Sequence, residues 1–287
     1  MKIVRTTGEL REVVARARRE EVRVGLVPTM GAFHEGHLAL MRRAGEICGL
    51  VVVSLFVNPA QFNESADLDR YPRDEAGDAG MAEGAGVHVL FAPSVAEVYP
   101  DGFSTTVEVT GVSEPLEGAV RGPAHFRGVA TVVAKLLNMA QPDDAFFGQK
   151  DAQQAVLVRR MVRDLDLPVR IEVCPTVREP DGLAMSSRNV LLTPDARRRA
   201  PALHAALRGI EARIAAGERD SARLASDATS MLAGHEVVPE YLAIVSATSL
   251  RPVDRIEGEV LVAIAARFGA VRLIDNVMIP PVPVSTG

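Results

Sequence analysis

The sequence predicts an α/β protein whose larger, amino-terminal domain is a parallel sheet covered by helices on both faces. Short apolar runs, the pattern of fully buried strands, alternate there with segments whose apolar residues recur at helical intervals. From about residue 176 this alternation gives way to two long helical segments, followed by apolar runs typical of an antiparallel sheet. We therefore expect two domains, 1–176 and 177–287, of which the second is smaller and of the α+β type.

The first domain is expected to begin with a helix, because Thr6 and Glu9 have capping-box spacing and apolar residues follow them at helical intervals. The strands expected after it are 22–27, 50–57, 87–91, 145–147 and 169–174, and the helices are 36–48, 67–84, 128–140 and 151–165. Parallel sheets bind ligands at the carboxyl ends of their strands. The functional loops should therefore follow Val27, Phe56 and Phe147.

The second domain is expected to open with a turn-like segment, VREPDGLAMSSRN. A long helix over 193–216 and a helix that begins at Ser221 follow, and then strands at 241–245 and 260–268. The end of the chain, PPVPVSTG, is predicted to be a frayed tail.

Composition excludes several classes of protein. Among 287 residues, the net charge of −5 and the 4% aromatic content disfavour a nucleic-acid binder, which needs basic surface and stacking platforms. The opening MKIVRTTGEL places charges where a secretory signal would be apolar, and the apolar run 50–57 is too short to cross a bilayer. Cys48 and Cys174 lie in apolar surroundings, which favours core thiols over a disulfide. We expect a cytoplasmic protein with neither nucleic-acid nor membrane partners.

The segment PTMGAFHEGH contains two histidines, His34 and His37, at a predicted strand-to-helix junction. Zinc is weakly supported, because ligands on one helix face stand four residues apart and no further cysteine or histidine lies nearby. Gly31 and Gly36 would let the backbone approach an anion at the helix start, where two imidazoles could donate to phosphate oxygens. In a second interpretation, which the sequence leaves open, one histidine caps the helix and the other is packed.

The segment FFGQKDAQQ places Lys150 and Gln154 on one face of a first helical turn. A lysine at a helix amino terminus is unfavourable against the macrodipole unless an anion is bound there. The alternative is a solvated lysine.

Two further segments carry polar side chains after predicted elements. Ser186 and Ser187 with Arg188 suit phosphate oxygens, although such a tripeptide also suits an ordinary polar turn. Asn58 and Gln61 follow a buried strand, where their amides could orient a small polar substrate or could simply end the strand. Neither a Walker A loop nor GxGxxG follows a strand. Jointly, the histidines, Lys150 and the Ser-Ser-Arg segment indicate a polyanion site.

Five motifs, in this order and at these intervals, resemble the pantoate–beta-alanine ligase family: PTMGAFHEGH, SLFVNPAQF, HFRGVATVVAKLLN, FFGQKDAQQ and GLAMSSRN. The resemblance extends over residues 6–279. HEGH and MSSRN are similar to the HIGH and KMSKS motifs of class I aminoacyl-tRNA synthetases and related nucleotidyltransferases. The resemblance implies a Rossmann-like first domain, a carboxyl-terminal lid domain and a cytoplasmic homodimer.

The resemblance also implies an activity: ligation of pantoate and beta-alanine with ATP and Mg²⁺ to give pantothenate, AMP and pyrophosphate, through an enzyme-bound pantoyl adenylate. It implies that His37 donates a proton, that His34 contacts phosphate, and that Lys150 and Arg188 complete the catalytic set. Residues implied to bind ATP are Pro28, Thr29, Met30, Gly31, His34, His37, Gly148, Gln149, Lys150, Asp151, Val177, Met185, Ser186, Ser187 and Arg188. Residues implied to bind pantoate are Gln61, Gln154 and Met30, and Gln61 would also contact beta-alanine.

Some features depart from the family pattern or stay unassigned. Gln149 stands where many members have glutamate, Ala152 replaces an aromatic residue, and RGPAH before Phe126 differs from the common Arg-Pro-Gly-His form. No Mg²⁺ ligands are assigned. Three rivals remain: a nucleotidyltransferase that needs no amine, a tRNA-binding module, and a nucleotide sensor without turnover.

Overall fold

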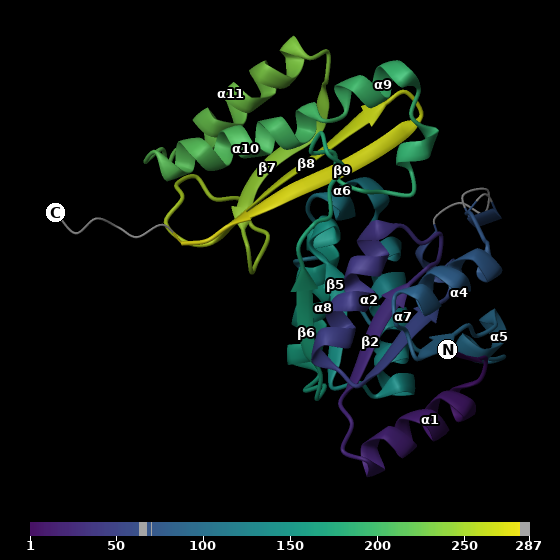
Figure 1. Ribbon diagram of the computed structural model, residues 1–287. Coiled ribbons are helices and arrows are strands. Elements are labelled where there is room, and N and C mark those ends of the chain that lie inside the picture. The colour runs from purple at the N-terminus through teal and green to yellow at the C-terminus, as the bar shows by residue number, and fades with distance from the viewer. Residues whose placement is uncertain (63–67, 70, 282–287) are drawn as a thin grey trace. The chain divides into compact units, whose positions relative to one another are not determined.

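The computed structural model describes residues 1–62, 68–69 and 71–281, and the chain forms two compact units (Figure 1). The first unit comprises Met1–Gln149 and Leu157–Pro175. The second comprises Lys150–Val156 and the chain from Thr176 onward. A short segment around Lys150 thus belongs to the second unit although it precedes the last strand of the first.

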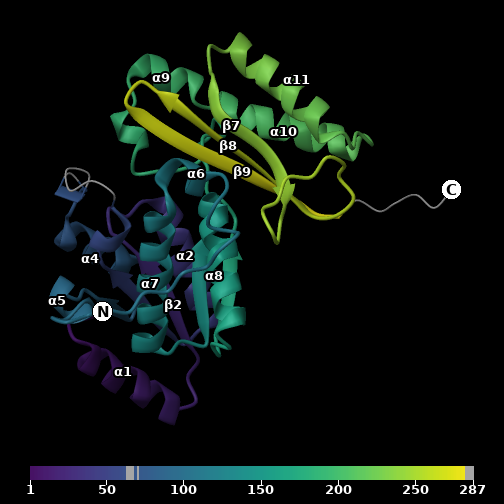
Figure 2. The ribbon, with the colours of Figure 1, turned by 180° about the vertical axis from the view of Figure 1, so that it is seen from behind.

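The first unit contains a parallel sheet in the order β1-β4-β3-β2-β5-β6, which confirms the predicted fold class. Its strands are β1 (Lys2–Val4), β2 (Val24–Thr29), β3 (Leu50–Leu55), β4 (Val89–Phe91), β5 (Asp144–Gly148) and β6 (Arg170–Cys174). The central strands β2 and β3 are apolar except for Thr29 and Ser54, because both faces of the sheet are covered. The helix α2 lies in front of the sheet in Figure 1, and α7 lies in front of it in the opposite view of Figure 2, so the two helices cover opposite faces.

Side-chain caps start several helices of this unit. They are α1 (Thr7–Arg19), α2 (Glu35–Ile47), α4 (Glu75–Gly84), α5 (Val95–Val98), α6 (Glu117–Arg121), α7 (Pro123–Ala140) and α8 (Ala152–Asp164), the first turn of α8 lying in the second unit. The predicted capping box at Thr6 and Glu9 starts α1. The prediction of one helix over 67–84 was only partly correct: residues 68–69 are helical, but α4 begins at Glu75, where the Asp74 side chain caps the Gly77 N–H. Asp67 and Arg70 lie outside the described residues.

Two strands of the first unit differ from the prediction. Pro28, expected to end β2, lies inside it and pairs with Ser54 of β3. Proline fits because β5 pairs with β2 only at Gly25 and Leu26, so the other side of the strand needs no N–H at this position. The strand β1 was not predicted; it has three residues and lies at the sheet edge.

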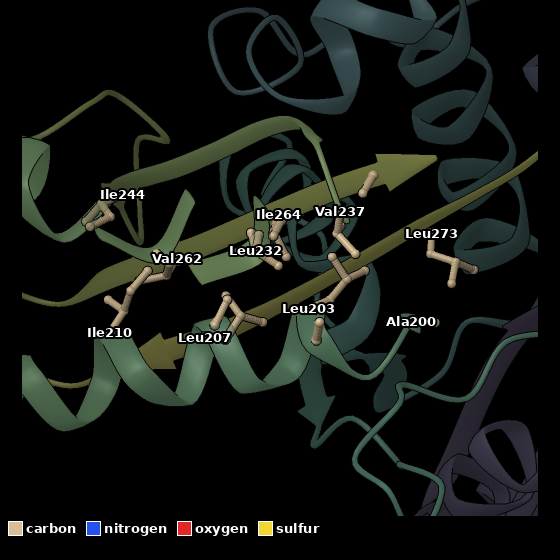
Figure 3. Close-up of a cluster of buried hydrophobic side chains, with 14 of the residues drawn as sticks. Ala200, Leu203, Leu207, Ile210, Leu232, Val237, Ile244, Val262, Ile264 and Leu273 are labelled. Carbon is tan, nitrogen blue, oxygen red and sulfur yellow. The ribbon is translucent and has the colours of Figure 1, made fainter. Parts of the chain in front are cut away.

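The second unit packs helices against an antiparallel sheet in the order β7-β8-β9. Its elements are α9 (Pro194–Arg199), α10 (Ala202–Ala215), α11 (Ser221–Gly234), β7 (Pro239–Ser246), β8 (Val260–Phe268) and β9 (Val271–Ile279). Leu203, Leu207 and Ile210 of α10 point toward β8, which carries Val262 and Ile264 (Figure 3). This apolar layer is the core of the unit.

The prediction of one helix over 193–216 was wrong. Pro201 has no N–H to continue the helical hydrogen bonds, so α9 ends at Arg199 and a new helix starts at Ala202. The strand β9 was also missed, because Arg272 and Asp275 interrupt its apolar pattern.

Candidate active site

The two histidines lie where the loop after β2 enters α2. His34 is the N-cap residue: its Nδ1 accepts a hydrogen bond from the Gly36 N–H at 3.1 Å. The Nδ1 of His37 accepts from the His34 N–H at 3.3 Å, and the two ring centroids stand 4.2 Å apart. The capping interpretation is therefore correct for His34, and His37 closes the same capping box.

These two bonds fix which ring nitrogens can donate. A nitrogen that accepts a hydrogen bond carries no proton, so each neutral ring holds its proton on Nε2. Both imidazoles thus have an Nε2–H donor beside the positive end of α2. Capping and anion binding, which the sequence posed as alternatives, are compatible because they use opposite nitrogens of the same rings.

The loop before the histidines is held by Asp78 of α4. Gly31 and Ala32 have φ values of +86° and +53°, in the left-handed region. The Asp78 carboxylate accepts from the Ala32 N–H at 2.9 Å and the Phe33 N–H at 2.7 Å. A Cβ on Gly31 would lie 2.7 Å from Leu55 Cδ1 and 2.8 Å from Asp78 Oδ2, so only glycine fits. Asp78 was not among the residues predicted from the sequence, although it precedes the buried Ala82 by one helical turn.

A buried amide cluster follows β3. Asn58, 1% exposed, donates from Nδ2 to Gln61 Oε1 at 3.0 Å and to the Gly128 carbonyl at 3.1 Å. Tyr99 donates its hydroxyl to Asn58 Oδ1 at 2.8 Å, and burial raises the pKa of Tyr99 to about 12, which keeps it a neutral donor. Because Oε1 of Gln61 is occupied, its Nε2 is directed to Met30, 3.0 Å from the sulfur.

This cluster brings together Met30 and Gln61, two residues predicted to bind pantoate. The close approach of α7 to the segment that carries Gln61 depends on Gly128 of α7, where a Cβ would stand 2.2 Å from the Ala60 carbonyl oxygen. Tyr99 was not predicted from the sequence, because nothing in the residues around it indicates a partner 41 positions away.

In the second unit, Lys150 lies in a turn of 3-10 helix, Gln149–Asp151, directly before α8. Its side chain is only 20% exposed, and Nζ stands 3.7 Å from Asp151 Oδ1, a loose ion pair. This burial argues against the solvated-lysine alternative. Gln154 lies half-buried in the first turn of α8.

The Ser-Ser-Arg segment follows a short hairpin of the second unit. Arg178 and Ala184 form its bridge, and the Met185 N–H donates to the Val177 carbonyl at 2.9 Å. The Arg188 N–H then donates to Ser186 Oγ at 3.2 Å, which closes a turn with Arg188 exposed. This local geometry agrees with a polar turn as well as with a phosphate-binding loop.

The chain matches the family model described as pantoate-beta-alanine ligase over residues 2–278. It belongs to the pantoate–beta-alanine ligase family. The curated pantothenate synthetase of Chloroflexus aurantiacus is 52% identical over 278 residues, 96% of this chain and 97% of that protein. The one from Moorella thermoacetica is 51% identical over 281 residues, with 97% and 99% coverage.

Solved structures agree with this assignment. The crystal structure of pantothenate synthetase from Thermus thermophilus superposes with a TM-score of 0.87 at 46% identity and covers 96% of this chain and 99% of its own. A pantoate-beta-alanine ligase from Francisella tularensis, complexed with beta-gamma ATP and beta-alanine, has a TM-score of 0.79 at 33% identity and covers 97% of each chain.

Neither a metal cluster nor a membrane-spanning helix is found in the part of the chain that the structure describes. Within 1–62, 68–69 and 71–281, no group of three or more His, Cys, Asp or Glu side chains is arranged to hold a metal ion. Over the same ranges, no helix is long and apolar enough to span a bilayer.

Proposed function

We propose that this chain uses ATP to ligate pantoate to beta-alanine, through an enzyme-bound pantoyl adenylate, and releases AMP and pyrophosphate. The observation that carries the proposal is the pair His34 and His37 at the start of α2, where each Nδ1 accepts a backbone N–H in the capping box and the ring proton therefore lies on Nε2. The family membership supports it, as does the Francisella tularensis relative complexed with beta-gamma ATP and beta-alanine.

In the first half-reaction, a pantoate carboxylate oxygen attacks the α-phosphorus of ATP, and the bond from that phosphorus to the bridging oxygen of pyrophosphate breaks. Negative charge grows on the departing pyrophosphate. We assign its stabilisation to the Nε2–H donors of the histidines and to the start of α2, with His37 as the proton donor. Lys150 and Arg188 are proposed to add positive charge that offsets the repulsion between the two anions.

Pantoate binding is assigned to Gln61, Gln154 and Met30. The hydrogen bond from Asn58 turns Oε1 of Gln61 toward Asn58, which leaves the two N–H donors of its NH₂ group on the other side of the amide to direct at a carboxylate or hydroxyl. In the second half-reaction, the beta-alanine amine attacks the acyl carbon of the adenylate, the amide bond forms and AMP leaves with the former carboxylate oxygen. Gln61 is also proposed to contact beta-alanine.

Mg²⁺ fits this chemistry as an ion carried by the nucleotide. The described residues offer no three-ligand cluster, and Mg²⁺ in phosphoryl and nucleotidyl transfer is commonly held by substrate phosphates and water with few protein ligands. When bound, it would supply charge neutralisation on the phosphates. The other ATP contacts proposed from the family motifs are Pro28–Gly31, Gly148, Gln149, Asp151, Val177 and Met185–Ser187.

Three further parts of the proposal come from the family resemblance. The carboxyl-terminal domain is proposed to act as a lid, because an acyl adenylate hydrolyses in open water. The chain is proposed to work in the cytoplasm and as a homodimer. Solution scattering with and without ATP tests the lid, and an unchanged scattering profile would count against it.

ATP–pyrophosphate exchange tests the function. We expect exchange that depends on pantoate, with net AMP production only after beta-alanine is added. A nucleotidyltransferase would release pyrophosphate without a carboxylate substrate, a sensor would bind ATP without turnover, and a tRNA-binding synthetase would exchange with an amino acid. Any of these results would reject the proposal.

A further inference from the structure

Two neighbouring polar residues, Asp275 and Asn276, are buried in the middle of β9 at 3% and 4% exposure. They pair with the apolar Ile264 and Ala263 of β8. Successive residues of a strand point to opposite faces, so the two side chains serve different neighbours. Polar groups buried in a small core are costly unless each has hydrogen-bond partners, which makes those partners informative.

Asn276 holds the backbone of Lys150. Its Nδ2 donates to the Lys150 carbonyl oxygen at 2.9 Å, across 126 positions of sequence and within the second unit. The long lysine side chain pivots about four carbon–carbon bonds, so the place of its backbone decides which points its Nζ can reach. This partly buried hydrogen bond from β9 therefore holds the backbone from which the Lys150 side chain extends.

Asp275 holds the base of the hairpin that precedes Met185–Arg188. Its two oxygens accept from Arg178 at 2.7 and 2.9 Å, a bidentate pair, and the Arg178 side chain is 20% exposed. Arg178 also donates to the Gly182 carbonyl at 3.0 Å, at the turn of the hairpin. One guanidinium thus ties the start and the turn of the hairpin to β9.

We propose that the Asp275–Asn276 pair positions the two ATP-binding segments of the second unit, Asn276 through the Lys150 backbone and Asp275 through Arg178. This inference rests on the function proposed above for Lys150 and Met185–Arg188. Neither residue of the pair touches the reacting atoms in this account; both are positioning residues. Displacing a catalytic group by about 1 Å can cost roughly 10²-fold in rate, which sets the size of effect to expect.

The test for Asn276 is a double-mutant cycle with Lys150, read as the single-turnover rate of pantoate-dependent adenylate formation, which stays measurable in slow variants. We expect Asn276→Ala to lower this rate about 10- to 100-fold, with the KM for pantoate unchanged. In a Lys150→Ala background, Asn276→Ala should lower it less than about twofold, because the side chain that it positions is gone.

The cycle separates positioning from general destabilisation. A merely structural loss would lower the rate by the same factor in both backgrounds, and that result would overturn the proposal, as would a wild-type rate for Asn276→Ala. Asn138→Ala is the control, since Asn138 also donates from Nδ2 to a backbone carbonyl, that of Ala134 in α7, at 2.8 Å. It should leave the rate unchanged. If Asn276→Ala fails to fold, Asn276→Ser, which keeps a short polar side chain, takes its place in the cycle.

The test for Asp275 uses its partner. Arg178→Lys keeps the positive charge but loses the bidentate hydrogen bonding of the guanidinium. We expect the KM for ATP to rise about tenfold or more at an unchanged KM for pantoate. Arg213→Lys is the matched control, because Arg213 of α10 also bonds two carboxylates of the same unit, Glu218 in the loop after α10 and Asp227 in α11. An unchanged KM for ATP in Arg178→Lys would contradict this half of the proposal. An absence of pantoate-dependent exchange in the wild type would instead reject the proposed function itself.

Discussion

Replacing Asp78 by asparagine should loosen the loop that precedes His34, residues 30–33, without altering any residue proposed to contact substrate. The carboxylate accepts from two backbone groups, the Ala32 N–H at 2.9 Å and the Phe33 N–H at 2.7 Å. Asparagine keeps one oxygen for one of them but turns an NH₂ group toward the other. One charge-assisted bond is lost and one buried N–H has no acceptor.

The magnitude follows from that lost bond. A hydrogen bond to a charged group contributes about 1.5–3 kcal/mol, so the equilibrium between formed and open loop should shift roughly 10- to 150-fold toward opening. The left-handed Ala32 adds to this, because its backbone relaxes once the loop opens. Since Phe33 directly precedes His34, the Nε2–H donors of both histidines lose their fixed place, and pantoate-dependent exchange should fall about tenfold or more.

Two measurements check the prediction on the same preparation. Hydrogen exchange of a peptide that covers residues 31–34 reports opening of the loop, and ATP–pyrophosphate exchange reports its consequence. Asp74→Asn is the matched control, because Asp74 caps the same helix through the Gly77 N–H at 2.9 Å and asparagine is an equally good cap. The reasoning is refuted if Asp78→Asn keeps wild-type protection and a wild-type rate.

Four further outcomes are expected. His37→Ala and Lys150→Ala should each lower adenylation about 10²-fold or more while the unfolding midpoint stays within a few degrees; near-normal turnover would remove the assigned role. Leu207→Ala, at a fully buried position of the second core, should cost about 2–5 kcal/mol in denaturant unfolding, and a loss below about 1 kcal/mol would show that the packing is looser than described. Burial raises the pKa of Asp144, but hydrogen bonds from Arg23 and Arg170 outweigh it and lower the pKa below 3.8. The stability that Asp144→Asn removes should therefore be full at pH 7 and shrink as acid titrates the folded carboxylate. A difference in stability between wild type and Asp144→Asn that widens in acid would contradict this. Burial raises the pKa of Cys48 to about 12, so a thiol reagent at pH 8 should label it only after unfolding, and rapid labelling of the native protein would argue otherwise.

The sequence was most informative where local patterns decide structure. The apolar runs identified five of the six strands of the parallel sheet, all but β1, and the Thr6–Glu9 spacing placed the first helix start correctly. The break at Pro201 was also local and visible, and the prediction of a continuous helix failed because the apolar periodicity on either side was given more weight than the proline.

Residues that act through partners distant in sequence were missed. Asp78 contacts a loop 46 positions away and Tyr99 an amide 41 positions away, and their neighbours in sequence are those of an ordinary charged helix and an ordinary loop. Asp275 and Asn276 even obscured the strand on which they lie, since polar residues break the alternation that identifies a strand. Such residues become recognisable only when the fold brings their partners to them.

The transfer of a carboxylate oxygen tests the central claim most directly. Pantoate labelled with ¹⁸O in its carboxylate is incubated with ATP, beta-alanine and the protein, and the AMP is examined by mass spectrometry. If a pantoyl adenylate forms, one labelled oxygen remains on phosphorus when the amine displaces AMP, so each AMP should gain a single ¹⁸O. Unlabelled AMP, or ADP in its place, would contradict adenylation of pantoate.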